Sequence, residues 1–189
     1  GSVDPIRDAE TIETELLLAD MESLDKQIEG ISRKAKGGDK ELQAQLGFME
    51  EIKAVLDDGK PARTVEVNNE DKERWMKQFA LITAKPILYV CNVSEDDTAE
   101  GNDFTKRVEE MVKAQNAEMV VICASIEAEI AQLDTEEDKR EFLETMGLDE
   151  PGLNRIIRAG YKLLDLQTYF TAGPKEARAW TVRVGAKAP

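Results

Sequence analysis

Two short apolar runs with one expected helix between them constrain the fold of this chain most. The first run covers residues 87–91, the second covers 119–124, and residues 103–115 between them have the pattern of a helix. Both runs are continuously apolar, as strands covered on both faces are. Two such strands joined through a helix form a parallel β–α–β unit with a right-handed crossover. We therefore expect an α/β fold for residues 66–163.

Polar residues end the first run abruptly, because Asn92, Ser94 and Glu95 follow Cys91 almost at once. In a parallel α/β sheet, ligands bind beyond the carboxyl ends of the strands. These side chains are therefore expected where a nucleotide base could be read. The spacing alone leaves a second interpretation open, in which Asn92 merely ends a strand or belongs to an unused glycosylation sequon.

The N-terminal part of the chain has the pattern of a helical hairpin. Apolar residues recur at helical spacing on both sides of the glycine pair at 37–38, with Leu17, Met21, Leu24, Ile28 and Ile31 before it and Leu42, Leu46, Met49, Ile52 and Leu56 after it. Two such stripes joined by a short turn pack antiparallel on each other. We expect an antiparallel coiled-coil hairpin over residues 9–65, preceded at 1–8 by a cloning scar (Gly1-Ser2) and a linker.

Basic residues gather at the expected tip of this hairpin, namely Arg33, Lys34, Lys36 and Lys40. A long arm that carries cations at its far end suits contact with a large partner such as RNA. The alternative interpretation is that these residues form an ordinary solvated surface on a purely structural hairpin. It stays open because charge patterning alone is a weak signal.

The composition excludes several functional classes. The net charge of −14 argues against wholesale nucleic-acid binding, and the absence of histidine rules out Ser-His, Cys-His and histidine–metal chemistry. No run is apolar and long enough to cross a membrane, and no secretory leader is visible. Cys91 and Cys123 each lie inside an apolar run, which is typical of reduced, buried thiols in a cytoplasmic protein.

Phosphoryl-transfer machinery is not visible in these 189 residues, since no Gly-x4-Gly-Lys-Ser/Thr loop occurs. The acids at 95–97 are too few for a metal site. We therefore expect no catalytic residue, no metal ligand and no bound cofactor. Two strands are also too few for a doubly wound sheet, and residues 168–171 and 177–184 suggest a separate hairpin of strands.

Four segments together resemble the YchF/Obg-like ATPase family, a group of P-loop nucleotide hydrolases. They are Lys34-Ala-Lys-Gly-Gly-Asp-Lys40, Lys85-Pro-Ile-Leu-Tyr-Val-Cys-Asn-Val-Ser-Glu95, Cys123-Ala-Ser-Ile-Glu-Ala-Glu129, and Gly147-Leu-Asp-Glu-Pro-Gly-Leu-Asn-Arg-Ile-Ile-Arg-Ala-Gly-Tyr161 continued by Leu166-Gln-Thr-Tyr-Phe-Thr-Ala-Gly173. The resemblance implies the central part of such a protein: an inserted coiled-coil hairpin, the last strands of a P-loop-type nucleotide-binding domain, and, at 164–189, the truncated start of a β-grasp TGS domain.

The resemblance also implies site residues and partners. Asn92, Val93, Ser94 and Glu95 match the base-recognition motif, and Cys123, Ala124 and Ser125 match the second base-side loop. Related GTPases have Lys and Asp where this chain has Val93 and Glu95, so ATP is expected to bind at least as well as GTP.

In the intact protein, the family implies ATP or GTP with Mg²⁺, hydrolysis of ATP, and ribosome or RNA contact through the basic tip and the TGS region. The chain by itself is expected to be an inactive fragment. A helical module that binds protein or RNA and has no nucleotide role is the alternative.

Overall fold

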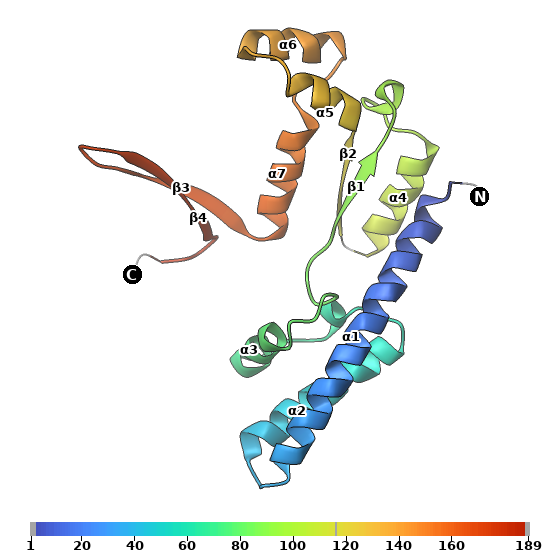
Figure 1. Ribbon diagram of the computed structural model, residues 1–189, viewed down its shortest axis with the longest axis vertical. Helices are drawn as coiled ribbons and strands as arrows, with labels where there is room; N and C mark the ends of the chain where they lie inside the picture. Colours follow the sequence, from blue (N-terminus) through green and yellow to red (C-terminus); the bar gives the residue numbers. More distant parts are fainter. Residues whose placement is uncertain (1–2, 116, 188–189) are drawn as a thin grey trace. The chain divides into compact units, whose positions relative to one another are not determined.

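The computed structural model describes residues 3–115 and 117–187, and the chain divides into two compact units, Gly1–Pro86 and Ile87–Pro189 (Figure 1). Each unit is described by itself. The expected cloning scar, Gly1 and Ser2, lies outside the described residues.

The first unit is built on two long helices, α1 (Pro5–Ala35) and α2 (Lys40–Asp57), which pack against each other along the hairpin (Figure 1). Helix α1 begins earlier than the expected linker end, because the Asp4 side chain accepts hydrogen bonds from the N–H groups of Ile6 and Arg7 and Pro5 fits the first helical turn. Asp39 caps α2 in the same way. Gly38, with a φ of 85°, supplies the left-handed turn residue between the helices.

A short helix, α3 (Glu70–Phe79), completes the core of this unit, together with the 3₁₀ turn η1 (Ala62–Thr64). The core contains Leu24, Phe48, Met49, Ile52, Leu56, Ala62, Trp75, Phe79 and Leu81. The Phe48 ring is central, since its centroid lies 6.3 Å from that of Trp75 and 6.1 Å from that of Phe79. The apolar stripe of α2 therefore packs on α3 as well as on α1.

A buried carboxylate ties α1 to the segment that follows α3. Asp20 is 2% exposed, and it accepts hydrogen bonds from the Ile82 N–H at 2.8 Å, the Thr83 N–H at 2.7 Å and the Thr83 hydroxyl at 2.6 Å. The Ala62 N–H in turn donates to Thr83 Oγ1 at 3.0 Å. Buried backbone N–H groups need acceptors, and Asp20 is the acceptor for the buried Thr83 as well as for the neighbouring Ile82.

The second unit contains the expected β–α–β unit. Strands β1 (Leu88–Asn92) and β2 (Glu118–Ile122) are parallel, with Cys91 opposite Val121, and α4 (Asp103–Ala114) connects them. The second strand ends before the expected residue 124, because α5 (Ala124–Ile130) already begins there. Helices α6 (Glu136–Thr145) and α7 (Gly152–Leu163) follow, and α7 and α4 flank the strand pair (Figure 1).

Coverage of these strands is less complete than the apolar runs predict. Val120 is buried, but Val90 is 44% exposed. The reason is that, within the described residues, the parallel sheet has only these two strands, so each lacks a neighbour on its outer side. The apolar run of β1 is thus suited to a wider sheet than the one present here.

Strands β3 (Leu166–Ala172) and β4 (Ala177–Arg183) form an antiparallel hairpin after α7, with Tyr169 opposite Trp180. The expected hairpin is confirmed, with a longer first strand. Phe170 is 78% exposed and Trp180 is 43% exposed. In the part of the chain that the structure describes, no helix is sufficiently long and apolar to span a membrane.

Candidate functional site

The carboxyl ends of β1 and β2 meet at one polar cluster. The Ala124 N–H donates to Asn92 Oδ1 at 3.0 Å, and the Val93 N–H donates to the Ile122 carbonyl oxygen at 2.9 Å. Asn92 and Ala124 are both exposed. The two sequence segments that resemble base-recognition loops are therefore held together by a side-chain bond, at the edge where parallel sheets bind ligands.

Glu95 is drawn into the same cluster by the second loop. The Ser125 hydroxyl donates to Glu95 Oε1 at 3.0 Å, and its oxygen also lies 3.0 Å from Cys123 Sγ. Glu95 opens a 3₁₀ turn, η2 (Glu95–Asp97), directly after the strand. This turn bends the chain back so that an exposed carboxylate faces the N-terminus of α5.

Ser94 turns to its own loop. Its hydroxyl donates to Asp97 Oδ2 at 2.9 Å, and its carbonyl oxygen accepts from the Thr98 hydroxyl at 3.0 Å. Asn102 Nδ2 donates to the same Asp97 oxygen at 2.8 Å. Hydrogen bonds from Asn102 and from Ser94 lower the pKa of Asp97, so this carboxylate stays charged and braces the loop. Asp97 could be noted in the sequence only as one of the acids at 95–97, and no local pattern predicts its bond with Asn102.

The two thiols differ in their electrostatic setting, although both are free. Burial raises the pKa of Cys91. Burial also raises the pKa of Cys123, but hydrogen bonds from the Ser125 hydroxyl and from the N–H groups of Ile126 and Ser125 outweigh it, and the net pKa lies below the ordinary value. Cys123 immediately precedes α5 and is 3% exposed. Its sulfur is therefore a buried member of the cluster, in contact with the Ser125 hydroxyl.

A glutamate of α5 fixes the start of α7. Glu127 accepts the Gly152 N–H at 2.6 Å through one oxygen and the Leu153 N–H at 3.1 Å through the other. A carboxylate is favourable at a helix N-terminus, where backbone N–H groups are unpaired. A side chain at position 152 would meet Ile122 Cγ2 at 2.7 Å, so glycine allows this close approach. Glu127 lies far from Gly152 in the sequence, and no local sequence pattern predicts their contact.

The basic tip of the hairpin is exposed at all four predicted residues, Arg33, Lys34, Lys36 and Lys40. Arg33 and Lys34 lie in the last turn of α1, Lys36 caps it, and Lys40 opens α2. None of the ion pairs seen among the described residues includes these four side chains. Among the same residues, no group of three or more acidic or cysteine side chains is placed to hold a metal ion.

Known proteins resemble the chain along its whole length. It is 50% identical over 189 residues to the ribosome-binding ATPase YchF of Haemophilus influenzae and 49% identical over 191 residues to that of Bacillus subtilis, covering 51% and 52% of those proteins. It is 37% identical over 194 residues to the Obg-like ATPase 1 of Rattus norvegicus, of which it covers 48%. This chain is a homologue of the YchF/Obg-like ATPases.

The fold agrees with this assignment. A solved structure of the Schizosaccharomyces pombe YchF GTPase matches all of the chain and 51% of its own length, with a TM-score of 0.86 and 30% identity. No family model matches the sequence. The chain spans about half the length of the curated YchF relatives that it matches. The predicted family is thereby confirmed, and so is the α/β class of the fold.

Of the seven residues predicted from the YchF resemblance, the structure brings Asn92, Glu95, Cys123, Ala124 and Ser125 into one hydrogen-bonded cluster. Ser94 bonds within its own loop, and Val93 contributes its backbone N–H to the strand pair. Their role toward a nucleotide stays a prediction.

Proposed function

We propose that the cluster at the ends of β1 and β2 reads the base of a nucleotide, in a ribosome-associated ATPase of the YchF type. The observation that carries the proposal is the hydrogen bond from the Ala124 N–H to Asn92 Oδ1. This bond holds the loop after β1 and the loop after β2 together. An asparagine amide has both a donor and an acceptor, and with its oxygen engaged by Ala124 its NH₂ group is directed as a donor. A purine N7 is a suitable acceptor for it.

The presence of Glu95 supports an affinity for ATP that is at least as high as the affinity for GTP. In the related GTPase motif, an aspartate accepts hydrogen bonds from the N1 and N2 groups of guanine. A glutamate is one methylene longer, so its carboxylate is misplaced for this pair of bonds. The Ser125 hydroxyl also holds Glu95 Oε1 at 3.0 Å, which turns the carboxylate toward α5. A site that loses a bidentate grip loses most of its discrimination. Val93 further removes the lysine that the guanine-specific motif carries.

In this proposal, phosphate binding and phosphoryl transfer are carried out by residues of the full-length protein outside these 189. Phosphoryl transfer requires a glycine-rich cradle, a lysine, a Mg²⁺-binding hydroxyl and a residue that positions water. The chain contributes base contacts only, so ATP hydrolysis with Mg²⁺ is proposed for a full-length protein that contains it. Cytoplasmic ribosomes are the proposed partner, because two relatives are named for ribosome binding.

The alternative is a helical interaction module with no nucleotide role, and the four exposed cations at the hairpin tip are the observation that favours it. It predicts that substitutions in the cluster of Asn92 and Ser125 leave every binding activity unchanged.

Substitution of Asn92 tests the proposal. In a full-length protein that contains this chain, Asn92→Ala removes both the loop clamp and the base contact. We expect the Kd for ATP to rise about tenfold, which corresponds to about 1.4 kcal/mol. The measurement is a titration with a fluorescent ATP analogue, and Asp96→Ala, at an exposed acid in the same loop, is the matched control. Equal affinity in both variants would favour the helical interaction module.

A further inference from the structure

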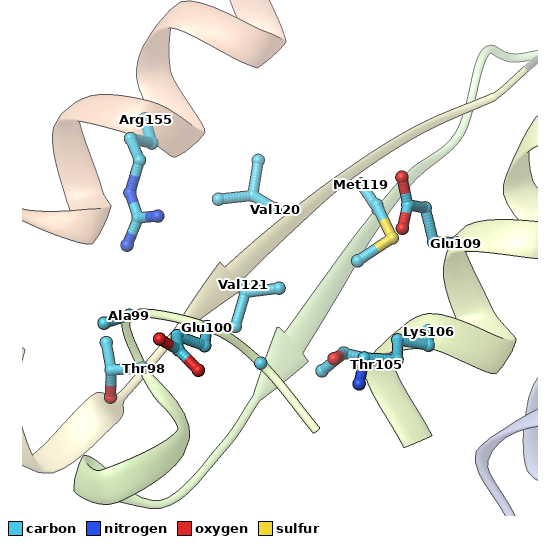
Figure 2. Close-up of a pocket in the computed structure, with 11 residues that line it drawn as sticks. Thr98, Ala99, Glu100, Thr105, Lys106, Glu109, Met119, Val120, Val121 and Arg155 are labelled. Carbon is cyan, nitrogen blue, oxygen red and sulfur yellow. The ribbon is translucent and has the colours of Figure 1, made fainter. Parts of the chain in front are cut away.

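The Glu95 carboxylate is held from one side only, by α5. The Ser125 hydroxyl donates to Glu95 Oε1 at 3.0 Å, and among the described residues this carboxylate has no ion pair and no second hydrogen-bond partner. Both side chains are exposed, and neither lines the hollow beside β2 that Figure 2 shows. A ligand at the open edge of the sheet can therefore reach the second carboxylate oxygen, Oε2, while Oε1 is engaged.

The length of Glu95 does not by itself determine where the carboxylate lies. A glutamate has one more side-chain torsion than an aspartate, so its staggered rotamers place the carboxylate in several positions. In some of these positions the side chain folds back toward the backbone, which offsets the extra methylene. The longer side chain therefore affects the choice of base only if another contact selects one position for its carboxylate.

Ser125 can make this selection because its own position is fixed. It lies in the first turn of α5, between Cys123 and Ile126, which are both buried. Its hydroxyl oxygen also lies 3.0 Å from Cys123 Sγ, so the hydroxyl group has a contact on α5 besides the one with Glu95. The burial of its two neighbours, and not the bond to Glu95, thus holds Ser125 in place.

The backbone of Glu95 is fixed as well. The Thr98 N–H donates to the Glu95 carbonyl oxygen at 3.2 Å and closes the η2 turn, and Thr98 is buried. The Thr98 side chain is in hydrogen-bond contact with Cys123, and Figure 2 shows it near the end of β2. Removal of the Ser125 hydroxyl therefore leaves the backbone in place and frees only the side-chain torsions of Glu95.

We propose that Ser125 is a positioning residue that sets the choice of base, because it holds Glu95 with only one carboxylate oxygen free. This role rests on the proposed function of the cluster in base recognition. Guanine has two neighbouring donors, the N1–H and N2 groups, and a carboxylate accepts from both only when both of its oxygens face the base. With Oε1 turned to Ser125 this pair of bonds does not form. Adenine has neither donor, so its binding loses nothing.

The contact of Asn92 with the second loop does not depend on the Ser125 side chain. A backbone group, the Ala124 N–H, makes the bond to Asn92 Oδ1. A substitution at Ser125 therefore leaves Asn92 in place for the base. Affinity for ATP and discrimination against GTP are consequently expected to respond to different substitutions, the first to Asn92 and the second to Ser125.

Nucleotide titrations on a full-length protein that contains this chain test the role of Ser125. In Ser125→Ala, we expect the ratio of the Kd for GTP to the Kd for ATP to fall about fivefold, which is the worth of one ordinary hydrogen bond, while the Kd for ATP stays within about twofold. Ser125→Thr keeps the hydroxyl group and should keep the ratio of the unmodified protein. Thr145→Ala, which removes an exposed hydroxyl of α6 in the same unit, is the matched control.

Two further titrations show whether Ser125 acts through Glu95 and through both guanine donors. In a protein that already carries Glu95→Ala, adding Ser125→Ala should leave the ratio unchanged, because the two residues act as one unit. Inosine triphosphate has the N1–H group but no N2 amine, so Ser125→Ala should raise its affinity less than that of GTP. The role of Ser125 is overturned if its effect persists without Glu95, or if inosine triphosphate gains as much affinity as GTP.

The Asn92→Ala variant separates a wrong role of Ser125 from a wrong proposed function. If Asn92→Ala weakens ATP binding while Ser125→Ala leaves the ratio unchanged, the cluster reads the base but Ser125 does not set the choice. If Asn92→Ala has no effect on ATP binding, base recognition by this cluster is wrong, and the role of Ser125 is overturned with it.

Discussion

Asp20 holds the polar centre of the Gly1–Pro86 unit. Replacement by asparagine keeps the size of the side chain but exchanges one acceptor oxygen for an NH₂ donor, which then faces either the N–H of Ile82 or the buried N–H of Thr83. We expect Asp20→Asn to lower the free energy of unfolding by about 3 kcal/mol, since a buried N–H without an acceptor costs its desolvation energy and the charged bond is lost as well.

Urea denaturation measures this change. Glu22→Gln, which alters an exposed carboxylate of the same helix, is the control and should leave the unfolding midpoint unchanged. If Asp20→Asn unfolds at the same urea concentration as the control, the three hydrogen bonds of Asp20 do not anchor the segment after α3.

Asp97 gives a pH-dependent prediction at the same scale. Hydrogen bonds from Asn102 and Ser94 place its folded pKa below the unfolded value. Its contribution to stability is therefore fully present above the ordinary aspartate pKa of about 3.9 and is lost as the pH falls through the folded pKa. Ser94→Ala should raise the Asp97 pKa in an NMR titration of the side-chain carboxyl carbon, while Ser125→Ala should not. An unshifted pKa in Ser94→Ala would show that Ser94 does not brace the loop.

At the scale of elements, the paired helices α1 and α2 present a tip that their packing does not use. Arg33, Lys34 and Lys36 are exposed, so their reversal to glutamate should leave helix content and folding unchanged. We expect the triple reversal to weaken ribosome association of a full-length protein that contains this chain, most strongly at low salt, where charges are least screened.

Co-sedimentation with ribosomes across a salt series measures this association. Reversal of Lys26, Lys60 and Lys77, three exposed cations elsewhere in the same unit, is the control for net charge. If both triple variants lose ribosomes equally, overall charge and not the tip governs binding. If neither loses them, the hairpin is structural.

At the scale of the whole molecule, periodic patterns predicted what local sequence can encode. The helices of the hairpin, the parallel strand pair and the C-terminal strand hairpin all follow from apolar spacing and glycine turns. The contacts of Asp20 with Thr83 and of Glu127 with Gly152 could not be predicted, because they join residues far apart in the sequence and leave no periodic trace.

The candidate site divides in the same way. Asn92 and Glu95 could be placed near the end of β1 from the sequence, because polar residues follow its apolar run directly. The bonds that connect them to Ala124 and Ser125 depend on the register of β1 with β2, which the sequence does not state.

The choice of base tests the central claim most directly. Competitive titrations of ATP and GTP should be made on a full-length protein that contains this chain, and again on its Glu95→Asp, Val93→Lys double variant. We predict that the unmodified protein binds ATP at least as tightly as GTP, and that the double variant shifts toward GTP by tenfold or more, about 1.4 kcal/mol. A strong preference for GTP in the unmodified protein, or a double variant with unchanged preference, would contradict the assignment of this cluster to base recognition.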